Sequence, residues 1–457
     1  MGLKTLRRVL LIAGVGVLLA AMVAVMPATA TTGGLQLTVS PKVSAADTPL
    51  SIRVSGLTPG QTVTLSVTSV DAKGVKWNSS STYKASPAGT VDPANTPAVG
   101  GSYTGVDAMG PVDMMAGPPD SAPLNSYSVG TSPGWPFGTS TIFADDWYAW
   151  ASCPSALKCS WAKPLPFVFS VTAGKANAST TVWRGPANRV TARSESVAST
   201  GIYGVFWQPP AGLDNHIGVV EFTGSFGGID TSVGALLAMH GYPTLDLAYF
   251  GEPGLPPLPL PGIAPTLPLE YFAKALHWLG NQPGVDAARL WLVGWSLGGQ
   301  AALLTAVHYP KLVHGVVVFE SDDAATCADA TWTLAGKPLP CTNMTNPPQT
   351  DNPAALIPVA QIRGPIEFVC GEQDMDLECG ATAQAMMAKL AAAHDPYPHK
   401  LVEYPDAGHG VGFIAPYIPG VVPAEEGTGW GAQGESPISN AIARAEQWPK
   451  LLAFLRN

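Results

Sequence analysis

Charged residues are scarce in this 457-residue chain: Asp, Glu, Lys and Arg make up 12% of it, against 46% hydrophobic residues. Long charged or glutamine-rich tracts are missing, which argues against extensive disorder. No Cys-x-x-Cys string and no cysteine with histidines at metal-ligand spacing is present, so we expect no metal site. No run of 18 apolar residues occurs after residue 30, so we expect no membrane span in the mature chain. What remains is a globular chain long enough for two domains.

The few charges are divided unevenly along the chain. Residues 201–457 carry 10 Lys+Arg and 24 Asp+Glu, a formal charge of −14, whereas residues 1–200 carry 14 and 9, a formal +5. An acidic C-terminal half disfavours nucleic acid and other polyanionic partners.

The first thirty residues are typical of an export signal. A basic start with Arg7 and Arg8 precedes an apolar run over residues 9–26 and small residues at 28–30. We therefore expect residues 1–30 to be a signal peptide that is cleaved, so that the mature protein is secreted or held in the cell envelope. An uncleaved membrane anchor is the alternative, because the apolar run approaches spanning length.

The cysteines fit such an export. Six cysteines form three close pairs, namely Cys153 with Cys159, Cys327 with Cys341, and Cys370 with Cys379. An even number of cysteines in an oxidising compartment indicates disulfides. We predict that each close pair forms one bond, although the sequence leaves other connectivities open.

Residues 34–185 have the pattern of an all-β domain. Segments 35–39, 50–54 and 62–67 alternate apolar and polar residues, and turns rich in Gly and Pro separate them. This pattern favours an immunoglobulin-like sandwich of short antiparallel strands. A segment rich in Pro, Gly, Ser and Trp interrupts the domain at 117–166, and we expect an ordered insertion there.

Residues 197–457 have a different pattern, in which apolar strand-like runs alternate with helical stretches. The expected strands are 217–222, 244–248, 290–293, 315–319, 366–370 and 400–404, and the expected helices are 269–279, 299–309 and 439–455. Such alternation predicts a mostly parallel sheet that helices cover on both faces.

The strongest chemical signal is the string Gly-Trp-Ser-Leu-Gly at 294–298. In a nucleophile elbow, serine lies on a tight strand-to-helix turn, and the flanking glycines let strand and helix pass closely. A second Gly-x-Ser-x-Gly string surrounds Ser132, but it lies among prolines. Ser296 instead follows an apolar strand and precedes a helical run. We predict Ser296 as a catalytic nucleophile and Ser132 as a turn serine.

A serine nucleophile needs a base and an acid that orients the base. His409 lies on a glycine-flanked loop after the last strand, where an imidazole would face the carboxyl edge of the sheet. The acid should follow the preceding strand, and we predict Asp374 there. Glu372 and Asp376 remain alternatives for the acid.

Two backbone N–H groups should stabilise the oxyanion that forms during acyl transfer. One is predicted to be that of Leu297, directly after the nucleophile, and the second should come from the loop after an early strand. The glycine-rich segment 224–228 follows such a strand, and we predict Ser225 as the donor, with Phe226 as the alternative. A phosphate-binding loop is the other reading of this segment, but its spacing matches neither a dinucleotide nor a Walker pattern.

Several longer strings add to these motifs. They are Asp71…Gly74…Trp77, Gly101–Gly110, Gly241–Gly251, Tyr397–Leu401 and Tyr404–His409. In this order they resemble the acyl-CoA thioesterase / bile acid-CoA:amino acid N-acyltransferase family. The resemblance implies an N-terminal β-sandwich followed by an α/β-hydrolase domain, with the catalytic serine, aspartate and histidine at Ser296, Asp374 and His409.

The residue at the nucleophile position indicates the type of reaction. Family members that conjugate amino acids carry cysteine there and thioester hydrolases carry serine, so Ser296 implies hydrolysis of a small acyl thioester or ester without any cofactor. The export signal and the acidic C-terminal half lead us to expect a substrate without a coenzyme A headgroup. Two other functions stay open: a cell-envelope esterase or acyltransferase acting on lipid or glycan esters, and a non-catalytic surface binding protein with a hydrolase fold.

Overall fold

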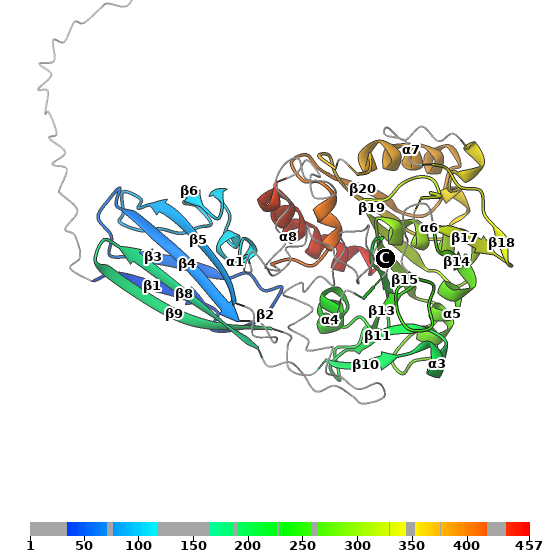
Figure 1. Cartoon of the computed structure of the whole chain (residues 1–457), viewed down its shortest axis with the longest axis horizontal. Coiled ribbons are helices and arrows are strands. Elements are labelled where there is room, and N and C mark those ends of the chain that lie inside the picture. The colour runs from blue at the N-terminus through cyan, green and yellow to red at the C-terminus, as the bar shows by residue number, and fades with distance from the viewer. Residues whose placement is uncertain are drawn as a thin grey trace, which may run out of the picture.

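In the computed structural model, an all-β part and an α/β part lie side by side (Figure 1). The structure describes residues 34–70, 76–116, 164–185, 190–225, 228–229, 231–257, 264–328, 330–343, 352–374, 376–417 and 436–457. The expected signal peptide, Ser132, Cys153, Cys159 and nearly all of the insertion at 117–166 lie outside these residues. Within the described ranges, no helix is long and apolar enough to span a bilayer.

The N-terminal part is a two-layer β structure. Its larger sheet has seven strands in the order β2-β9-β8-β4-β5-β6-β7, and β1 pairs with β3 in a second, smaller sheet. Their bounds are β1 (Gln36–Ser40), β2 (Val43–Ala45), β3 (Ser51–Ser55), β4 (Thr62–Val70), β5 (Lys76–Lys84), β6 (Ala98–Gly101), β7 (Thr104–Gly105), β8 (Leu165–Ala173) and β9 (Ala176–Gly185). Val39 and Ile52 of the small sheet share a core with Val67 and Phe169 of the large one. Alternation along β3 and β4 thus buries one side chain in two, as the sequence pattern predicted.

The C-terminal part contains an eight-stranded sheet in the order β10-β11-β13-β12-β15-β16-β19-β20. The bounds are β10 (Thr191–Glu195), β11 (Tyr203–Gln208), β12 (Gly218–Phe222), β13 (Thr244–Ala248), β15 (Leu290–Trp295), β16 (Gly315–Phe319), β19 (Ile366–Gly371) and β20 (His399–Tyr404). The pairs from β13 to β20 are parallel, and the pairs that include β11 are antiparallel. The carboxyl ends of the parallel strands therefore meet at one edge.

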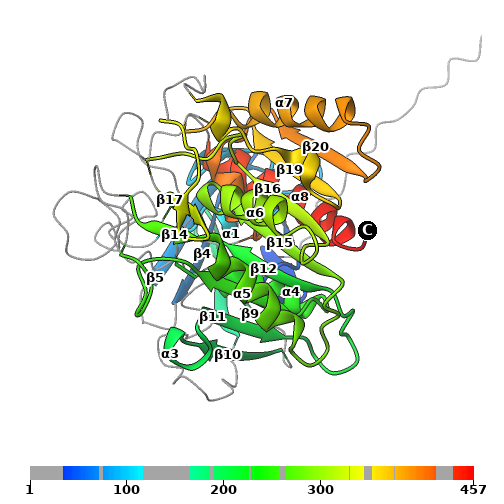
Figure 2. The ribbon, with the colours of Figure 1, turned by 90° about the vertical axis from the view of Figure 1, so that its right-hand side faces the viewer.

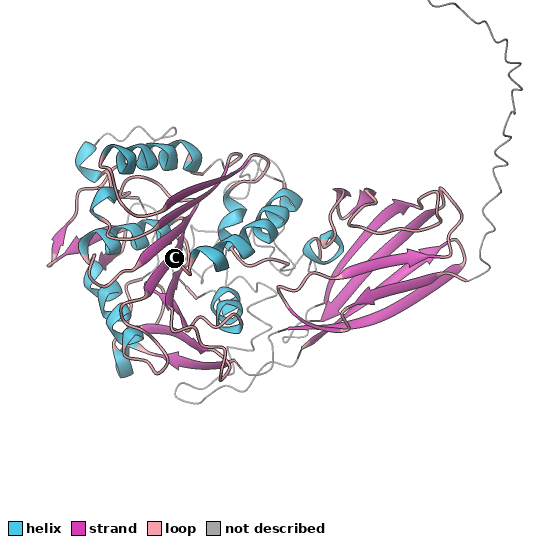
Figure 3. Ribbon diagram, turned by 180° about the vertical axis from the view of Figure 1, so that it is seen from behind, coloured by secondary structure: helices cyan, strands magenta, loops and turns pink. Residues whose placement is uncertain are grey.

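Helices cover both faces of this sheet (Figures 2 and 3). They are α3 (Val197–Thr200), α4 (Thr231–Met239), α5 (Leu269–Gly280), α6 (Leu297–His308), α7 (Cys379–Ala392) and α8 (Pro437–Phe454), and a small sheet joins β14 (Thr266–Pro268), β17 (Thr331–Leu334) and β18 (Lys337–Pro338). Val293 of β15 shares one core with α4 and α8, whereas its neighbour Leu292 shares the other core with α5, α6 and α7. Every central strand is thus buried on both faces, which explains its continuous apolar sequence.

The predicted start of this part at residue 197 is wrong, because β10 (Thr191–Glu195) already pairs with β11 in the eight-stranded sheet. Its sequence, Thr-Ala-Arg-Ser-Glu, is polar because the strand lies at the sheet edge. The apolar signal that located the central strands is therefore missing from it.

Polar contacts join the two parts of the chain. Asp47, from the N-terminal part, contacts His240 Nε2 at 2.5 Å and accepts a hydrogen bond from Trp448 Nε1 at 3.0 Å. Asp113 of α1 (Gly110–Asp113) is buried near Arg444 of α8. Burial raises the pKa of the Asp113 carboxyl well above its usual value, and the charge of Arg444 offsets part of this rise. Helix α8 therefore connects the β-sandwich to the sheet edge of the C-terminal part.

Candidate active site

Ser296 occupies a strained turn between β15 and α6. Its backbone has φ 54° and ψ −122°, a conformation that serine rarely adopts. A Cβ at Gly294 would lie 2.2 Å from the carbonyl oxygen of Gly298, and one at Gly298 would lie 2.2 Å from that of Thr223. Only glycine fits at both positions, so this segment has the geometry of a nucleophile elbow.

Hydrogen bonds hold the turn in place. The Ser296 N–H donates to the carbonyl oxygen of Phe319, at the end of neighbouring β16, over 2.9 Å. The Ser296 carbonyl accepts from the N–H of Gly299, also at 2.9 Å. Leu297 is the first residue of α6, where an N–H has no intrahelical acceptor and the helix dipole favours negative charge.

Asp374 follows β19 and contacts the predicted base directly. Its Oδ2 lies 2.7 Å from His409 Nδ1. Its Oδ1 accepts hydrogen bonds from the N–H groups of Asp376 at 2.8 Å and Leu377 at 3.1 Å. Three hydrogen bonds fix the orientation of this carboxylate, so the loop presents Asp374 to the imidazole.

The two alternative acids make other contacts. Asp376 contributes its backbone N–H to the carboxylate of Asp374. Glu372 is hydrogen-bonded to Glu403, and burial, together with the charge of that neighbour, raises the pKa of the Glu372 carboxyl. The structure therefore brings Asp374, and neither alternative, to His409.

His409 begins a short 3₁₀ helix, η4 (His409–Phe413), that helix α8 anchors. The Gly408 N–H donates to Asn440 Oδ1 at 2.9 Å, and the Gly410 carbonyl accepts from Arg444 at 2.9 Å. The imidazole packs against the ring of Trp295, at 5.5 Å between ring centroids, so it lies at the same sheet edge as Ser296. Asn440 and Arg444 were not predicted from the sequence, because a polar residue in a terminal helix carries no signal of this contact.

Glu320 is a further residue that the sequence analysis missed. It directly follows β16, is fully buried, and accepts a hydrogen bond from the Gly371 N–H at 2.5 Å. Ligand atoms of Glu320, Asp374 and His409 lie within 4.8 Å of one another. The 2.7 Å between Asp374 and His409 is a hydrogen-bond length and too short for a metal ion between the two atoms. The sequence could have indicated Glu320, because it is an acidic residue directly after a parallel strand next to β15 and β19.

The loop after β12 (Gly218–Phe222) reaches the nucleophile. A Cβ placed on Gly224 would lie 3.3 Å from the Cβ of Ser296, so the backbone at this point passes close to the serine side chain. Ser225 follows Gly224, whereas the alternative donor Phe226 lies outside the described residues. The structure therefore places the predicted donor one residue from this close approach to Ser296.

Two of the three predicted disulfides fall on described residues, and the structure contains both. Cys327 is bonded to Cys341, and Cys370 is bonded to Cys379. The structure does not test the third predicted bond. Its two residues, Cys153 and Cys159, lie outside the described part of the chain, so this pairing stays a prediction.

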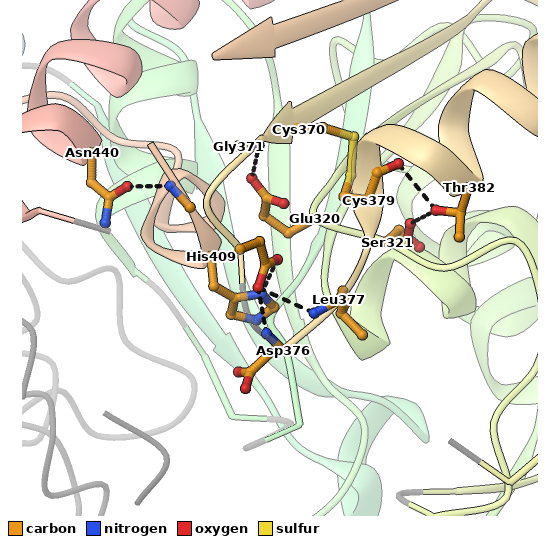
Figure 4. A network of polar contacts seen from close by, with 12 residues as sticks. Glu320, Ser321, Cys370, Gly371, Asp376, Leu377, Cys379, Thr382, His409 and Asn440 are labelled. Carbon is orange, nitrogen blue, oxygen red and sulfur yellow. Dashed lines mark hydrogen bonds and ion pairs between the residues drawn. A yellow bond between two sulfur atoms is a disulfide. The ribbon is translucent and has the colours of Figure 1, made fainter. Parts of the chain in front are cut away.

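One of the two bonds lies next to the predicted acid. Cys370 is the penultimate residue of β19, and Cys379 begins α7. The bond between them therefore closes the loop that carries Asp374 (Figure 4).

The sheet order, the elbow after β15, and the acid and histidine after β19 and β20 define the α/β-hydrolase class. Two family models match the chain: "Acyl-CoA thioester hydrolase/BAAT N-terminal region" over residues 47–133 and "BAAT / Acyl-CoA thioester hydrolase C terminal" over residues 267–457. Together they span more than half of the chain. The chain belongs to this acyl-CoA thioester hydrolase/BAAT family.

Proteins similar in sequence include N-acyltransferases and thioesterases named for acyl-coenzyme A. Acyl-coenzyme A amino acid N-acyltransferase 2 of Rattus norvegicus is 27% identical over 456 residues, covering 92% of this chain and 97% of that protein. Acyl-coenzyme A thioesterase 6 of Mus musculus is 26% identical over 433 residues, covering 90% and 93%. Among solved structures, a dienelactone hydrolase from Anabaena variabilis has a TM-score of 0.33 at 19% identity, covering 57% of this chain and 97% of that chain.

Proposed function

We propose that this protein is a serine hydrolase that cleaves acyl thioesters or esters through an acyl-Ser296 intermediate. In this proposal His409 is the general base, Asp374 orients it, and the N–H groups of Leu297 and Ser225 form the oxyanion hole. The family, with its thioester hydrolase relatives, supports hydrolysis of activated acyl groups.

The geometry supports a specific order of steps. Because His409 Nδ1 is hydrogen-bonded to Asp374, Nε2 is the nitrogen that accepts the proton of the Ser296 hydroxyl. The serine oxygen attacks the acyl carbonyl, and the resulting oxyanion accepts hydrogen bonds from the two backbone donors. His409 then protonates the leaving thiol or alcohol. A water molecule, deprotonated by His409, releases the acid from Ser296 in the second half-reaction.

The observation that carries this proposal is the Asp374–His409 hydrogen bond beside a serine in a strained elbow. We expect a fluorophosphonate probe to label Ser296 covalently. Labelling should vanish in Ser296→Ala and persist in Ser132→Ala, the matched control from the other Gly-x-Ser-x-Gly string. Peptide mapping that places the probe on a different residue would refute the assignment.

We further propose that the physiological substrate lacks a coenzyme A headgroup, because such a headgroup carries phosphates that favour nearby cations. Several cations of the C-terminal part already have partners. Lys389 pairs with Asp323 at 3.1 Å and Lys400 with Glu367 at 2.8 Å, while Arg444 is buried. The formal charge of −14 on residues 201–457 adds a long-range repulsion, which salt screens beyond about 8–10 Å.

A substrate panel tests this choice of leaving group. Relative kcat/KM should be compared for an acyl-CoA, the pantetheine thioester of the same acyl chain, and the matching oxygen ester. We expect the pantetheine thioester or the oxygen ester to equal or exceed acyl-CoA. A preference of about 100-fold or more for acyl-CoA would contradict the proposal. Glycine added as an acceptor should give free acid and no amide, since the nucleophile is serine.

Export through a cleaved signal peptide completes the proposal. The basic and apolar start of the sequence supports it, as do the bonds Cys327–Cys341 and Cys370–Cys379, which persist in oxidising compartments. N-terminal sequencing of the protein recovered from its native compartment should begin near residue 31. Alkylation without reductant should modify none of the six cysteines, and intact residues 1–30 or free thiols would contradict export.

A further inference from the structure

We propose that Tyr249 is a positioning residue that sets the geometry of the oxyanion hole. Tyr249 directly follows β13 (Thr244–Ala248), which pairs in parallel with β12, so it lies at the same sheet edge as the loop after β12. The proposal rests on the proposed serine mechanism. It extends that mechanism to a residue outside the triad of Ser296, Asp374 and His409.

The Tyr249 hydroxyl holds two consecutive peptide groups of that loop. It lies 2.7 Å from the carbonyl oxygen of Thr223 and 2.6 Å from that of Gly224, so it donates a bond shared between two acceptors. The side chain is 1% exposed, and its ring packs against Phe250 and Phe272, with centroids at 4.6 and 5.7 Å. The hydroxyl therefore has a fixed position.

Because peptide groups are planar, this contact also fixes the direction of the adjoining N–H groups. In a trans peptide the C=O and N–H bonds point in opposite directions. The carbonyls of Thr223 and Gly224 belong to the same peptide units as the N–H groups of Gly224 and Ser225. When both carbonyls point toward Tyr249, these two N–H groups point away from it.

The direction of the Ser225 N–H matters for catalysis, because this group is the proposed second oxyanion donor. Gly224 lies close to Ser296, since a Cβ added to it would be 3.3 Å from the serine Cβ. The Thr223 hydroxyl donates to the Gly228 carbonyl at 2.9 Å, which ties together the residues that flank the loop. Tyr249 thus aims the peptide of Ser225 while remaining outside the reacting groups.

Tyr249→Phe removes one oxygen atom and tests the proposal. Loss of a complete oxyanion donor lowers kcat about 10²–10³-fold, and a misaimed donor should lose part of that. We expect kcat for an activated ester to fall about 10- to 100-fold while KM changes by less than about threefold. The affinity for a boronic acid, which mimics the tetrahedral intermediate, should fall by the same factor as kcat/KM.

Tyr271→Phe is the matched control. The Tyr271 hydroxyl donates to the Ala248 carbonyl at 2.6 Å and accepts from the Tyr203 N–H at 3.0 Å, so its loss removes two hydrogen bonds next to Tyr249. The control should lower the thermal unfolding midpoint about as much as Tyr249→Phe, yet leave kcat and boronate affinity unchanged. If Tyr249→Phe does not fold, Thr223→Val loosens the same loop and should lower kcat with little effect on KM.

Two outcomes would overturn the positioning role. One is a Tyr249→Phe enzyme with wild-type kcat, and the other is a kcat loss that Tyr271→Phe shares. The serine mechanism itself is judged separately, because it fails only if the wild-type protein shows no Ser296-dependent turnover. A wild-type enzyme that loses activity in Ser296→Ala but not in Tyr249→Phe would refute the Tyr249 proposal alone.

Discussion

Replacing Gly298 with alanine tests whether the close approach of strand and helix at Ser296 determines activity. Gly298 lies in the first turn of α6, where alanine normally stabilises a helix by about 1 kcal/mol relative to glycine. The added Cβ, however, would lie 2.2 Å from the carbonyl oxygen of Thr223 and 2.6 Å from that of Phe222. Both are backbone atoms, so no side-chain rotation relieves the overlap.

The size of the effect follows from that distance. Ordinary contacts of a Cβ begin at 3.4 Å, so helix and loop must separate by about 1 Å. Overpacking of this kind costs about 1–3 kcal/mol, which outweighs the gain in helix propensity. A displacement of about 1 Å at catalytic groups lowers the rate about 10²-fold. We therefore expect kcat/KM to fall about 100-fold or more, with a modest decrease in the thermal unfolding midpoint.

The assay is hydrolysis of a p-nitrophenyl ester, with thermal unfolding followed by circular dichroism. Gly100→Ala, in β6, is the control, because a Cβ there meets nothing within 4 Å. It should leave both activity and the unfolding midpoint unchanged. Wild-type kcat/KM in Gly298→Ala would refute the argument that this contact positions the nucleophile and the oxyanion loop.

Three further predictions concern the groups around Ser296. Asp374→Asn should lower kcat about 10³–10⁴-fold, because His409 loses the partner of its imidazolium, and more than a tenth of wild-type kcat would contradict that role. Changing Cys370 and Cys379 to alanine should reduce activity severalfold and remove about 2–3 kcal/mol of stability, measured by ester hydrolysis and urea unfolding, whereas unchanged activity would show that the bond does not fix the acid loop. Arg444→Met removes a cation that lowers the pKa of Asp113, so this pKa should rise further. A carboxyl whose pKa is raised by folding destabilises the folded state as the pH rises, so the loss of thermal stability should be larger at pH 8 than at pH 5. An equal loss at both pH values would contradict this coupling.

The sequence alone determined the central strands and the nucleophile turn. Strands such as β16 (Gly315–Phe319) are buried on both faces, so their residues form continuous apolar runs that mark them without any structure. The elbow also has a local signature, because Gly294 and Gly298 flank Ser296 directly after an apolar strand. The polar edge strand β10 (Thr191–Glu195) has neither signal, and its place was found only in the structure.

Tertiary structure decided which polar groups meet at the sheet edge. Asp374, Glu372 and Asp376 all follow the same strand, and the fold of their loop gave only Asp374 the contact with His409. The contact of Tyr249 with the loop after β12 joins residues about 25 positions apart, so no local pattern contains it. Strand and turn formation depends on neighbours along the chain, whereas a catalytic constellation depends on which strand ends the topology brings together.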